Sequence, residues 1–284
     1  MDRKTINNCI IVIDKPNGQI CHEVTSFVKK ITDANRSGHA GTLDPNVSGV
    51  LPVALGKATK LLRYIAGKDK TYIGIIKFKR LLPREEIEKL FLDFTGEIYQ
   101  TPPKISAVRK VRRKRHIHHL KLLELNGRLA LFETTVDAGT YIRTLCEDIG
   151  KKCGGARMEE LRRTAVGNIS ETQSHTMQEL IDAVWFWKNK NDSSMLEKML
   201  MPPEMFIELP KVFINKNAVE QIFSGAQVMV PAVERFEDTV EVEKPVIIYC
   251  EQKFIGIGIA KIRKEDLQKK KKGLAVKLER VHKI

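Results

Sequence analysis

The chain has 284 residues, of which 42% are hydrophobic and 30% are charged, as expected for a folded protein with a sizeable core. Its longest unbroken apolar runs, such as residues 9–13 and 246–250, are five residues, whereas a membrane-spanning helix needs about twenty. A helical membrane protein is therefore excluded. Because the N-terminus also lacks the apolar stretch of a signal peptide, we expect an intracellular protein.

The formal charge of +14 is concentrated in two short segments. Residues 104–115 contain seven basic and no acidic side chains, and residues 261–272 contain seven basic and two acidic ones. Concentrated positive charge favours a polyanionic partner such as nucleic acid, because released counterions drive the association. The alternative is that both segments are simply solvated. The five cysteines form no C-x-x-C pair, and their odd number indicates neither a disulfide framework nor a zinc knuckle.

The first half of the chain is predicted to contain strands, helices and one long loop. Hydrophobic periodicity predicts strands over residues 10–14 and 71–78, and a turn is predicted at 16–18. It also predicts two helices, one with an apolar face at residues 24, 27, 28 and 31 and one with an apolar face at 87, 90, 91 and 94. The glycines and prolines of residues 36–56 predict a long loop between them. Pro102 and Pro103 then break the chain and open the basic segment.

The second half begins with a predicted strand over 128–138, in which alternate side chains from Ala130 to Val136 share one face. Predicted helices follow over 141–152, 157–163 and 180–187. Prolines at 202, 203 and 210 mark a domain boundary. Beyond it, four short β-type runs predict a small β-barrel of about 75 residues; they are residues 227–230, 245–250, 254–260 and 273–278.

The segment Gly38–Pro45 is the first candidate for chemistry. Its glycines allow a ligand to approach the backbone closely, and Pro45 restricts Asp44 to extended conformations that can present its carboxylate outward. An ordinary Asp-Pro turn is the simpler alternative. No phosphate-loop lysine follows the glycines and no G-x-G-x-x-G occurs, so nucleotide hydrolysis and Rossmann-type cofactor binding are poorly supported.

Five motifs in their order along the chain resemble the TruB/dyskerin family of RNA pseudouridine synthases. They are Asp14–Gly18, Gly38–Gly56, Lys70–Tyr72, Ala138–Arg143 and Glu160–Thr164. The residues around Asp44 and the segment Pro102–Val108 are most similar to the archaeal, dyskerin-like branch. Residues 209–284 resemble the PUA domain that follows the catalytic domain there, so the resemblance spans nearly the whole chain.

The resemblance implies an α+β protein with two domains. Residues 1–208 would form the catalytic domain, with a mixed, mainly antiparallel sheet and flanking helices, and residues 209–284 would form the PUA β-barrel. A basic loop over residues 102–120 would close over bound RNA. The cations expected to contact RNA phosphates there are Lys104, Arg109, Lys110, Arg112, Arg113, Lys114 and Arg115.

The resemblance also implies the reaction. Uracil is detached from its ribose, rotated and rejoined through carbon, without redox change or net hydrolysis, so no cofactor is implied. Asp44 would be the essential carboxylate, as nucleophile or as general base. Arg143 matches the family arginine that pairs with this carboxylate. Without the family, an exposed position in the first turn of a helix is the favoured interpretation of Arg143.

Three further residues match substrate contacts of the family. Tyr72 would stack on the flipped base, Leu161 would form an apolar wall of the pocket, and His39 would lie near the substrate backbone. The plain alternatives are core packing for Tyr72 and Leu161 and a structural loop histidine for His39. The histidines of residues 116–119 have no acidic or thiol partner close in sequence, so we expect no metal site there.

Three residues depart from the family pattern. Cys21, Arg157 and Ala232 stand where a serine, a histidine and a glycine are usual. The first change would alter a local hydrogen bond, the second would add charge near the pocket, and the third would alter a turn of the PUA domain. None removes a residue that the chemistry requires.

The leading hypothesis is a cytoplasmic pseudouridine synthase that works as the catalytic subunit of a box H/ACA ribonucleoprotein. In the branch that it resembles, a guide RNA selects the uridine in rRNA or tRNA, and small accessory proteins complete the particle. The first alternative is stand-alone modification of the T arm of tRNA. The second is an RNA-binding scaffold without activity, against which the presence of Asp44, Tyr72 and Arg143 argues.

Overall fold

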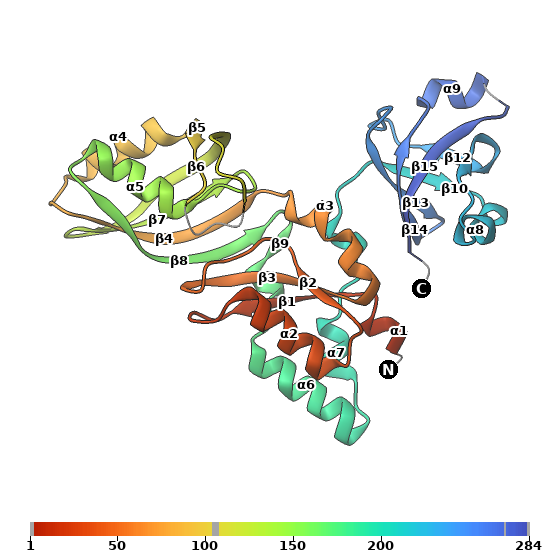
Figure 1. Ribbon diagram of the computed structural model, residues 1–284, viewed down its shortest axis with the longest axis horizontal. Helices are drawn as coiled ribbons and strands as arrows, with labels where there is room; N and C mark the ends of the chain where they lie inside the picture. The colour runs from red at the N-terminus through yellow and green to blue at the C-terminus, as the bar shows by residue number, and fades with distance from the viewer. Residues whose placement is uncertain (1–2, 104–107, 270, 283–284) are drawn as a thin grey trace. The chain divides into compact units, whose positions relative to one another are not determined.

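The structure is a computed structural model that describes residues 3–103, 108–269 and 271–282, and it divides at Phe206/Ile207 into two compact units (Figure 1). The first unit contains α1 (Arg3–Ile6), β1 (Ile10–Lys15), α2 (Cys21–Thr32), β2 (Ser37–His39), β3 (Val47–Leu55), η1 (Gly56–Leu61), α3 (Leu62–Ala66), β4 (Lys70–Phe78), α4 (Arg84–Phe94), β5 (Gly96–Gln100), β6 (Arg113–Asn126), β7 (Leu129–Val136), α5 (Ile142–Lys152), β8 (Ala156–Val166), β9 (Ile169–Ser170), η2 (Glu171–Gln173), α6 (Met177–Lys190), α7 (Ser194–Met199) and η3 (Pro203–Phe206).

One large sheet organises the first unit. Its strand order is β1-β3-β8-β4-β7-β6-β5, with β2 added to β3 and β9 added to β8. Every pairing is antiparallel except that of β3 with β8, which is parallel. Helices α4 and α5 lie together against β6 and β8, and α2 and α6 pack against β3 and β1 (Figure 1).

The clearest sequence patterns became the expected elements. The alternation predicted for β7 is present, because Ala130, Phe132, Thr134 and Val136 are all buried while the residues between them are not. Strands β1 and β4 and helices α2, α4, α5 and α6 also confirm the predicted strands and helices at those positions. Burial of one face of each helix against the sheet supplies the main driving force for this unit.

The long loop predicted for residues 36–56 is wrong, because this segment contains β2 and the nine-residue strand β3. Strand β3 is buried on both faces, so its side chains do not alternate between polar and apolar. Pro52 is tolerated there because it lies between the part of β3 that pairs with β8 and the part that pairs with β2. Asp44 therefore sits in a short bend between two strands.

The helix predicted for residues 157–163 is also wrong, because these residues belong to strand β8. The register with β4 shifts at two places, where β8 carries one extra residue. Each such bulge moves the period-2 pattern of β8 by one residue, so the sequence shows no steady alternation. The bulged strand lies between β3 and β4 at the centre of the sheet.

The basic loop predicted for residues 102–120 is shorter than expected. Strand β6 begins at Arg113, and Gln100, the last residue of β5, pairs directly with it. Residues 101–112 therefore connect two paired strands, and of these residues 104–107 are not described. The last three of the predicted phosphate-binding cations lie on a strand, where the sheet fixes their backbone.

The second unit is a smaller, mainly antiparallel sheet with one parallel pairing, of β10 with β13. Its elements are β10 (Lys211–Ile214), α8 (Lys216–Phe223), β11 (Val228–Met229), η4 (Val230–Ala232), β12 (Val233–Phe236), β13 (Pro245–Cys250), β14 (Lys253–Ala260), α9 (Lys264–Lys269) and β15 (Leu274–Val281). The strand order is β11-β15-β14-β13-β10-β12, around a separate apolar core. The predicted α+β class is thus confirmed. Among the described residues, no helix is long and apolar enough to span a membrane.

Candidate active site

Asp44 lies in the bend that joins β2 to β3. The bend begins where the Ala40 amide donates to the Pro52 carbonyl (3.0 Å) and ends where the Val47 amide donates to the Asp44 carbonyl (3.0 Å). Gly41 has a φ of +85°, a left-handed conformation that a side chain would strain. The side chain of Asp44 remains 44% exposed, so its carboxylate is accessible.

Arg143 is the second residue of α5 and reaches this carboxylate. Its Nη2 atom donates to Oδ2 of Asp44 at 2.6 Å, across 99 positions of sequence. The Arg143 side chain is 36% exposed, so the pair faces solvent and is open to a ligand. Arg143 does lie in the first turn of a helix and is partly exposed, as its plain interpretation has it, but its guanidinium is also paired with Asp44. The contact brings a positive charge directly against the carboxylate that the family resemblance names as essential.

Two fully buried cations, Arg163 and Lys15, bond to the main chain around the bend. The sequence patterns did not identify either of them as a site residue. Arg163 on β8 is 1% exposed, and its guanidinium donates to the carbonyls of Gly41 (3.0 Å) and Val50 (2.8 Å). Lys15 is 0% exposed, and its Nζ donates to the carbonyls of Pro45 (3.0 Å) and Pro16 (2.7 Å). Burial lowers the pKa of Lys15. Both side chains therefore satisfy main-chain acceptors on either side of Asp44.

A third buried cation, Lys70, starts β4. Its Nζ donates to the Ala66 carbonyl at 2.6 Å and also to the Lys68 carbonyl. Burial, reinforced by the nearby Arg163 charge, lowers the pKa of Lys70 to about 8. A methyl group added to Gly41 would lie 3.6 Å from Cε of Lys70, so this lysine packs directly against the bend.

Tyr72 and Leu161 lie on the same face of the sheet as Arg163. Tyr72 pairs with Arg163 across β4 and β8, and Leu161 is two residues before Arg163 on β8. Leu161 also pairs with Val47, whose amide is bonded to Asp44. Both side chains are largely buried, at 8% exposure for Tyr72 and 9% for Leu161.

His39 is the last residue of β2 and is half-buried. Its Nδ1 atom is buried and meets no hydrogen-bond partner among the described residues. Burial lowers the pKa of His39, and the Arg163 and His22 charges lower it further. The neutral imidazole is therefore the form to consider at this position.

The predicted phosphate-binding cations lie at the start of β6 and in the preceding loop. Lys104 lies outside the described residues, while Arg109, Lys110, Arg112 and Lys114 are exposed. Nζ of Lys110 donates to the Pro103 carbonyl (3.1 Å), and the Arg112 guanidinium lies 4.8 Å from the ring centre of Tyr99. Lys114 forms an ion pair with Glu97.

The remaining two of these cations are partly covered. Nη2 of Arg113 donates to the Arg109 carbonyl at 3.5 Å, and Nη1 of Arg115 donates to the Lys114 carbonyl at 2.8 Å. Nε of Arg115 is buried and finds no hydrogen-bond partner in the part of the chain that the structure describes. Arg113 and Arg115 therefore differ from the exposed loop cations in how freely they can move.

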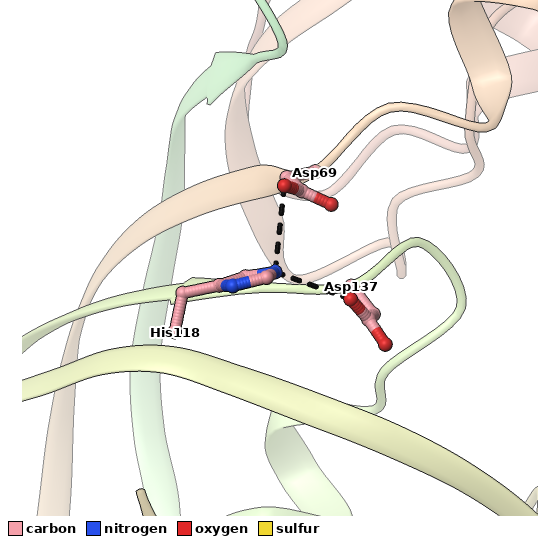
Figure 2. Close-up of side chains that lie close together, drawn as sticks. All are labelled: Asp69, His118 and Asp137. Carbon is pink, nitrogen blue, oxygen red and sulfur yellow. Dashed lines mark hydrogen bonds and ion pairs between the residues drawn. The ribbon is translucent and has the colours of Figure 1, made fainter. Parts of the chain in front are cut away.

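His118 does have acidic neighbours, contrary to the expectation from its sequence surroundings. Its Nε2 atom lies 3.1 Å from Oδ1 of Asp137 and 3.4 Å from Oδ2 of Asp69 (Figure 2). The other oxygen of Asp137 accepts from the His116 amide at 2.8 Å. These three side chains could hold a metal ion, but a histidine between two exposed carboxylates is equally a simple ion-pair cluster. The cluster ties β6 to the start of β4 and the end of β7.

The departures from the family pattern lie at three separate places. Cys21 begins α2 and contacts Leu43, directly before Asp44. Arg157 on β8 is 67% exposed and donates to Glu159 at 2.9 Å, so its charge is locally paired. Ala232 ends η4 in the second unit.

Comparison with protein families supports a single assignment. The TruB family pseudouridylate synthase N-terminal domain matches residues 29–81, the tRNA pseudouridylate synthase B C-terminal domain matches 143–208, and the PUA domain matches 210–282. The probable tRNA pseudouridine synthase B of Archaeoglobus fulgidus is 41% identical over 279 residues, which cover 97% of this chain and 86% of that protein. Its Methanocaldococcus jannaschii counterpart is 39% identical over 276 residues, which cover 96% and 82%.

Two solved structures share the whole architecture. A crystal structure of a Cbf5–Nop10–Gar1 complex contains a chain with a TM-score of 0.91 and 37% identity, covering 99% of this chain and 87% of that one. An H/ACA ribonucleoprotein bound to a substrate RNA containing 2′-deoxyuridine contains one with a TM-score of 0.89 and 36% identity, covering 98% and 86%.

A mixed sheet that presents a carboxylate–guanidinium pair, followed by a small β unit, defines an RNA pseudouridine synthase with a C-terminal PUA domain. The chain belongs to the TruB family of pseudouridylate synthases.

Proposed function

We propose that this chain isomerises uridine to pseudouridine in RNA and that Asp44 is the essential carboxylate. The observation that carries the proposal is the 2.6 Å contact between Asp44 and Arg143, in which both side chains remain accessible. Tyr72 and Leu161, on the sheet face next to the bend, support a pocket for a pyrimidine.

The reaction breaks the bond between C1′ of the ribose and N1 of uracil and forms a bond between C1′ and C5. The proton on C5 is lost and N1 gains one, so atoms and electrons balance without a cofactor. Asp44 acts either as nucleophile or as general base, and in both roles it must be ionised. Arg143 holds the carboxylate in place through its hydrogen bond to Oδ2 and supplies an opposite charge where the reaction takes place.

The target uridine must leave its stack to reach Asp44, which costs a few kcal/mol. In the proposed complex, Tyr72 stacks on the base and Leu161 forms an apolar wall of the pocket. The neutral imidazole of the half-buried His39 is proposed to lie near the sugar–phosphate backbone. The exposed cations Arg109, Lys110 and Arg112 bind phosphates without reading sequence.

We further propose that the chain acts in a cytoplasmic box H/ACA particle, as the catalytic subunit. Solved relatives of similar length occur in a Cbf5–Nop10–Gar1 complex and in an H/ACA ribonucleoprotein with substrate RNA. The PUA domain would bind the guide RNA, and small accessory proteins would complete the particle. Stand-alone modification of tRNA is a second candidate, since curated relatives at 41% and 39% identity are named tRNA pseudouridine synthase B.

The test follows release of tritium from RNA labelled at C5 of uridine. In a first mixture, purified protein is incubated with unmodified tRNA alone. In a second mixture, it is incubated with substrate RNA, guide RNA and accessory proteins. Activity only in the second mixture supports the guided role, and full activity on tRNA alone replaces it with the stand-alone role. Asp44→Asn should abolish release in the active mixture while RNA affinity changes within about three-fold. Turnover by a clean Asp44→Asn preparation, or no activity of the native chain in either mixture, would overturn the proposal.

A further inference from the structure

The residue before Asp44 is held by one buried side chain. The Leu43 amide donates to Sγ of Cys21 at 3.1 Å, and the Cys21 thiol donates to the Leu43 carbonyl at 3.4 Å. Cys21 is 3% exposed. Burial raises the pKa of its thiol, so the proton that this second bond requires is retained at neutral pH. One side chain thus occupies both polar groups of the residue next to Asp44.

The other half of the ion pair is held by the same kind of contact. The Tyr141 amide donates to Oε1 of Gln100 at 3.0 Å, and Nε2 of Gln100 donates to the Tyr141 carbonyl at 3.1 Å. Gln100 is also 3% exposed. Tyr141 is the N-cap residue of α5, so this contact fixes the start of the helix two residues before Arg143.

Such contacts matter here because the side chains of Asp44 and Arg143 are not themselves buried. Asp44 and Arg143 are each at least about one-third exposed, so burial does not enforce their 2.6 Å contact. Their geometry depends on where the main chain places them, and both lie outside the regular ladder of the sheet. A buried amide or carbonyl without its partner would draw the backbone toward another arrangement.

We infer that Cys21 and Gln100 are paired positioning residues, which set the main chain on the two sides of the Asp44–Arg143 pair. The inference rests on the proposed function, because it concerns the geometry of the proposed catalytic carboxylate. The hydrogen bonds of both side chains go to main-chain atoms of neighbouring residues and not to the carboxylate or the guanidinium. Their expected effect is therefore on turnover and not on RNA affinity.

Gln100 has a second consequence. It is the last residue of β5, and it pairs with Arg113 at the start of β6. The side chain that fixes the start of α5 thus belongs to the strand after which the basic segment begins.

The test uses Cys21→Ala, Cys21→Ser, Gln100→Met and the double variant Cys21→Ala/Gln100→Met, in the mixture that gives turnover. Cys9→Ala is the matched control, because Cys9 is also 3% exposed and its thiol donates to the Ile6 carbonyl, away from the Asp44 bend. The thermal midpoint of each variant is measured first. RNA dissociation constants and single-turnover rates are then measured at a temperature well below the lowest of these midpoints.

Cys21→Ala and Gln100→Met should each lower the single-turnover rate about 10- to 100-fold, with RNA affinity within about three-fold of native, because small misplacements of a reacting group are this costly. Cys21→Ser should recover most of the rate, since a hydroxyl also donates and accepts. Cys9→Ala should lower the thermal midpoint but not the rate. The double variant should lose less than the product of the two single losses, because both act on one ion pair.

Native rates for Cys21→Ala and Gln100→Met, with Asp44→Asn inactive, would overturn this inference and leave the proposed function intact. A serine variant as slow as the alanine variant would overturn the role assigned to the Cys21 hydrogen bonds. Multiplicative losses in the double variant would show that the two side chains act separately and would overturn their pairing. If Asp44→Asn remains active, the proposed function itself fails.

Discussion

In the proposed complex the Asp44 bend and the basic loop serve the same RNA, but they are built in opposite ways. Around the bend, Lys15, Cys21 and Arg163 are buried and bond to main-chain atoms, so each has one allowed position. The loop cations Arg109, Lys110 and Arg112 are exposed on residues that belong to no strand or helix. The bend can thus hold an atom to within fractions of an ångström, whereas the loop can supply charge without a defined geometry.

The largest effect on the single-turnover rate is expected from Arg143, the partner of the Asp44 carboxylate. Arg143→Ala removes the guanidinium that bonds the Asp44 carboxylate, and the single-turnover rate should fall about 100- to 1,000-fold. Arg143→Lys should recover little, because a lysine lacks the planar fork of the guanidinium. Rapid-quench measurement of tritium release checks both variants. A rate within about three-fold of native for Arg143→Ala would remove this pair from the mechanism.

A smaller effect is expected from Gly41→Ala. The new methyl group would sit at φ +85° and 3.2 Å from Nη1 of Arg163, so the bend must shift. We expect the rate to fall about ten-fold and the unfolding free energy to fall by about 1–2 kcal/mol. Gly127→Ala is the control, because Gly127 has a φ of +58° and no heavy atom within 4 Å of the added group. Urea titration should register both substitutions, but tritium release only the first.

Substitutions in the loop should behave differently, by changing affinity and not rate. Replacing Arg109, Lys110 and Arg112 by glutamine should lower the slope of log K against log salt by roughly 0.7–0.9 for each phosphate that the loop no longer neutralises. Lys114→Gln is the control, because Lys114 is already paired with Glu97 and its removal should change the slope little. Filter binding between low and moderate salt measures the slopes. Equal slopes for the native and triple variants would exclude the loop from the RNA interface.

The last effect concerns stability and pH at the buried Lys70, away from RNA binding and turnover. Its pKa is about 8 in the folded state, against an ordinary lysine pKa of 10.5, so between these values the unfolded chain binds the extra proton. Folding stability therefore rises with pH in this window, by at most about 1.4 kcal/mol per pH unit from this group. Buried cysteines with a raised pKa make stability fall as pH rises, which opposes the effect of Lys70. The contribution of Lys70 is therefore isolated by comparing the native chain with Lys70→Met. Urea titrations at about pH 7.5 to 10 should show a smaller rise of the unfolding free energy with pH in that variant than in the native chain.

Some elements could be predicted because one face of each is buried and the other is not. Strand β7 alternates cleanly, and α2 repeats its buried residues at helical spacing. Strand β3 could not be recognised, since both of its faces are buried and the pattern loses its contrast. Strand β8 was mistaken for a helix because two bulges interrupt its alternation.

The residues of the site also fall into two groups, those that the sequence indicates and those that only the structure reveals. Asp44 and Arg143 were named from motifs, and the structure brings them together, although their roles remain proposals. Lys15, Arg163 and Gln100 were not identified, because their partners are main-chain carbonyls and amides, which any residue provides. A side chain that supports backbone leaves no complementary residue type in the sequence. Only the folded geometry reveals it.

Strand order has a consequence for synthesis of the chain. Strands β3 and β4 follow each other in sequence, yet β8 separates them in the sheet and is made about ninety residues after β4 begins. Until β8 leaves the ribosome, a nascent chain carries two open sheet edges, the kind of surface that pairs with neighbouring chains. Asp44 likewise has no Arg163 beneath its bend during this interval. We therefore expect an incomplete chain to be more prone to pair with other chains before the central strand inserts.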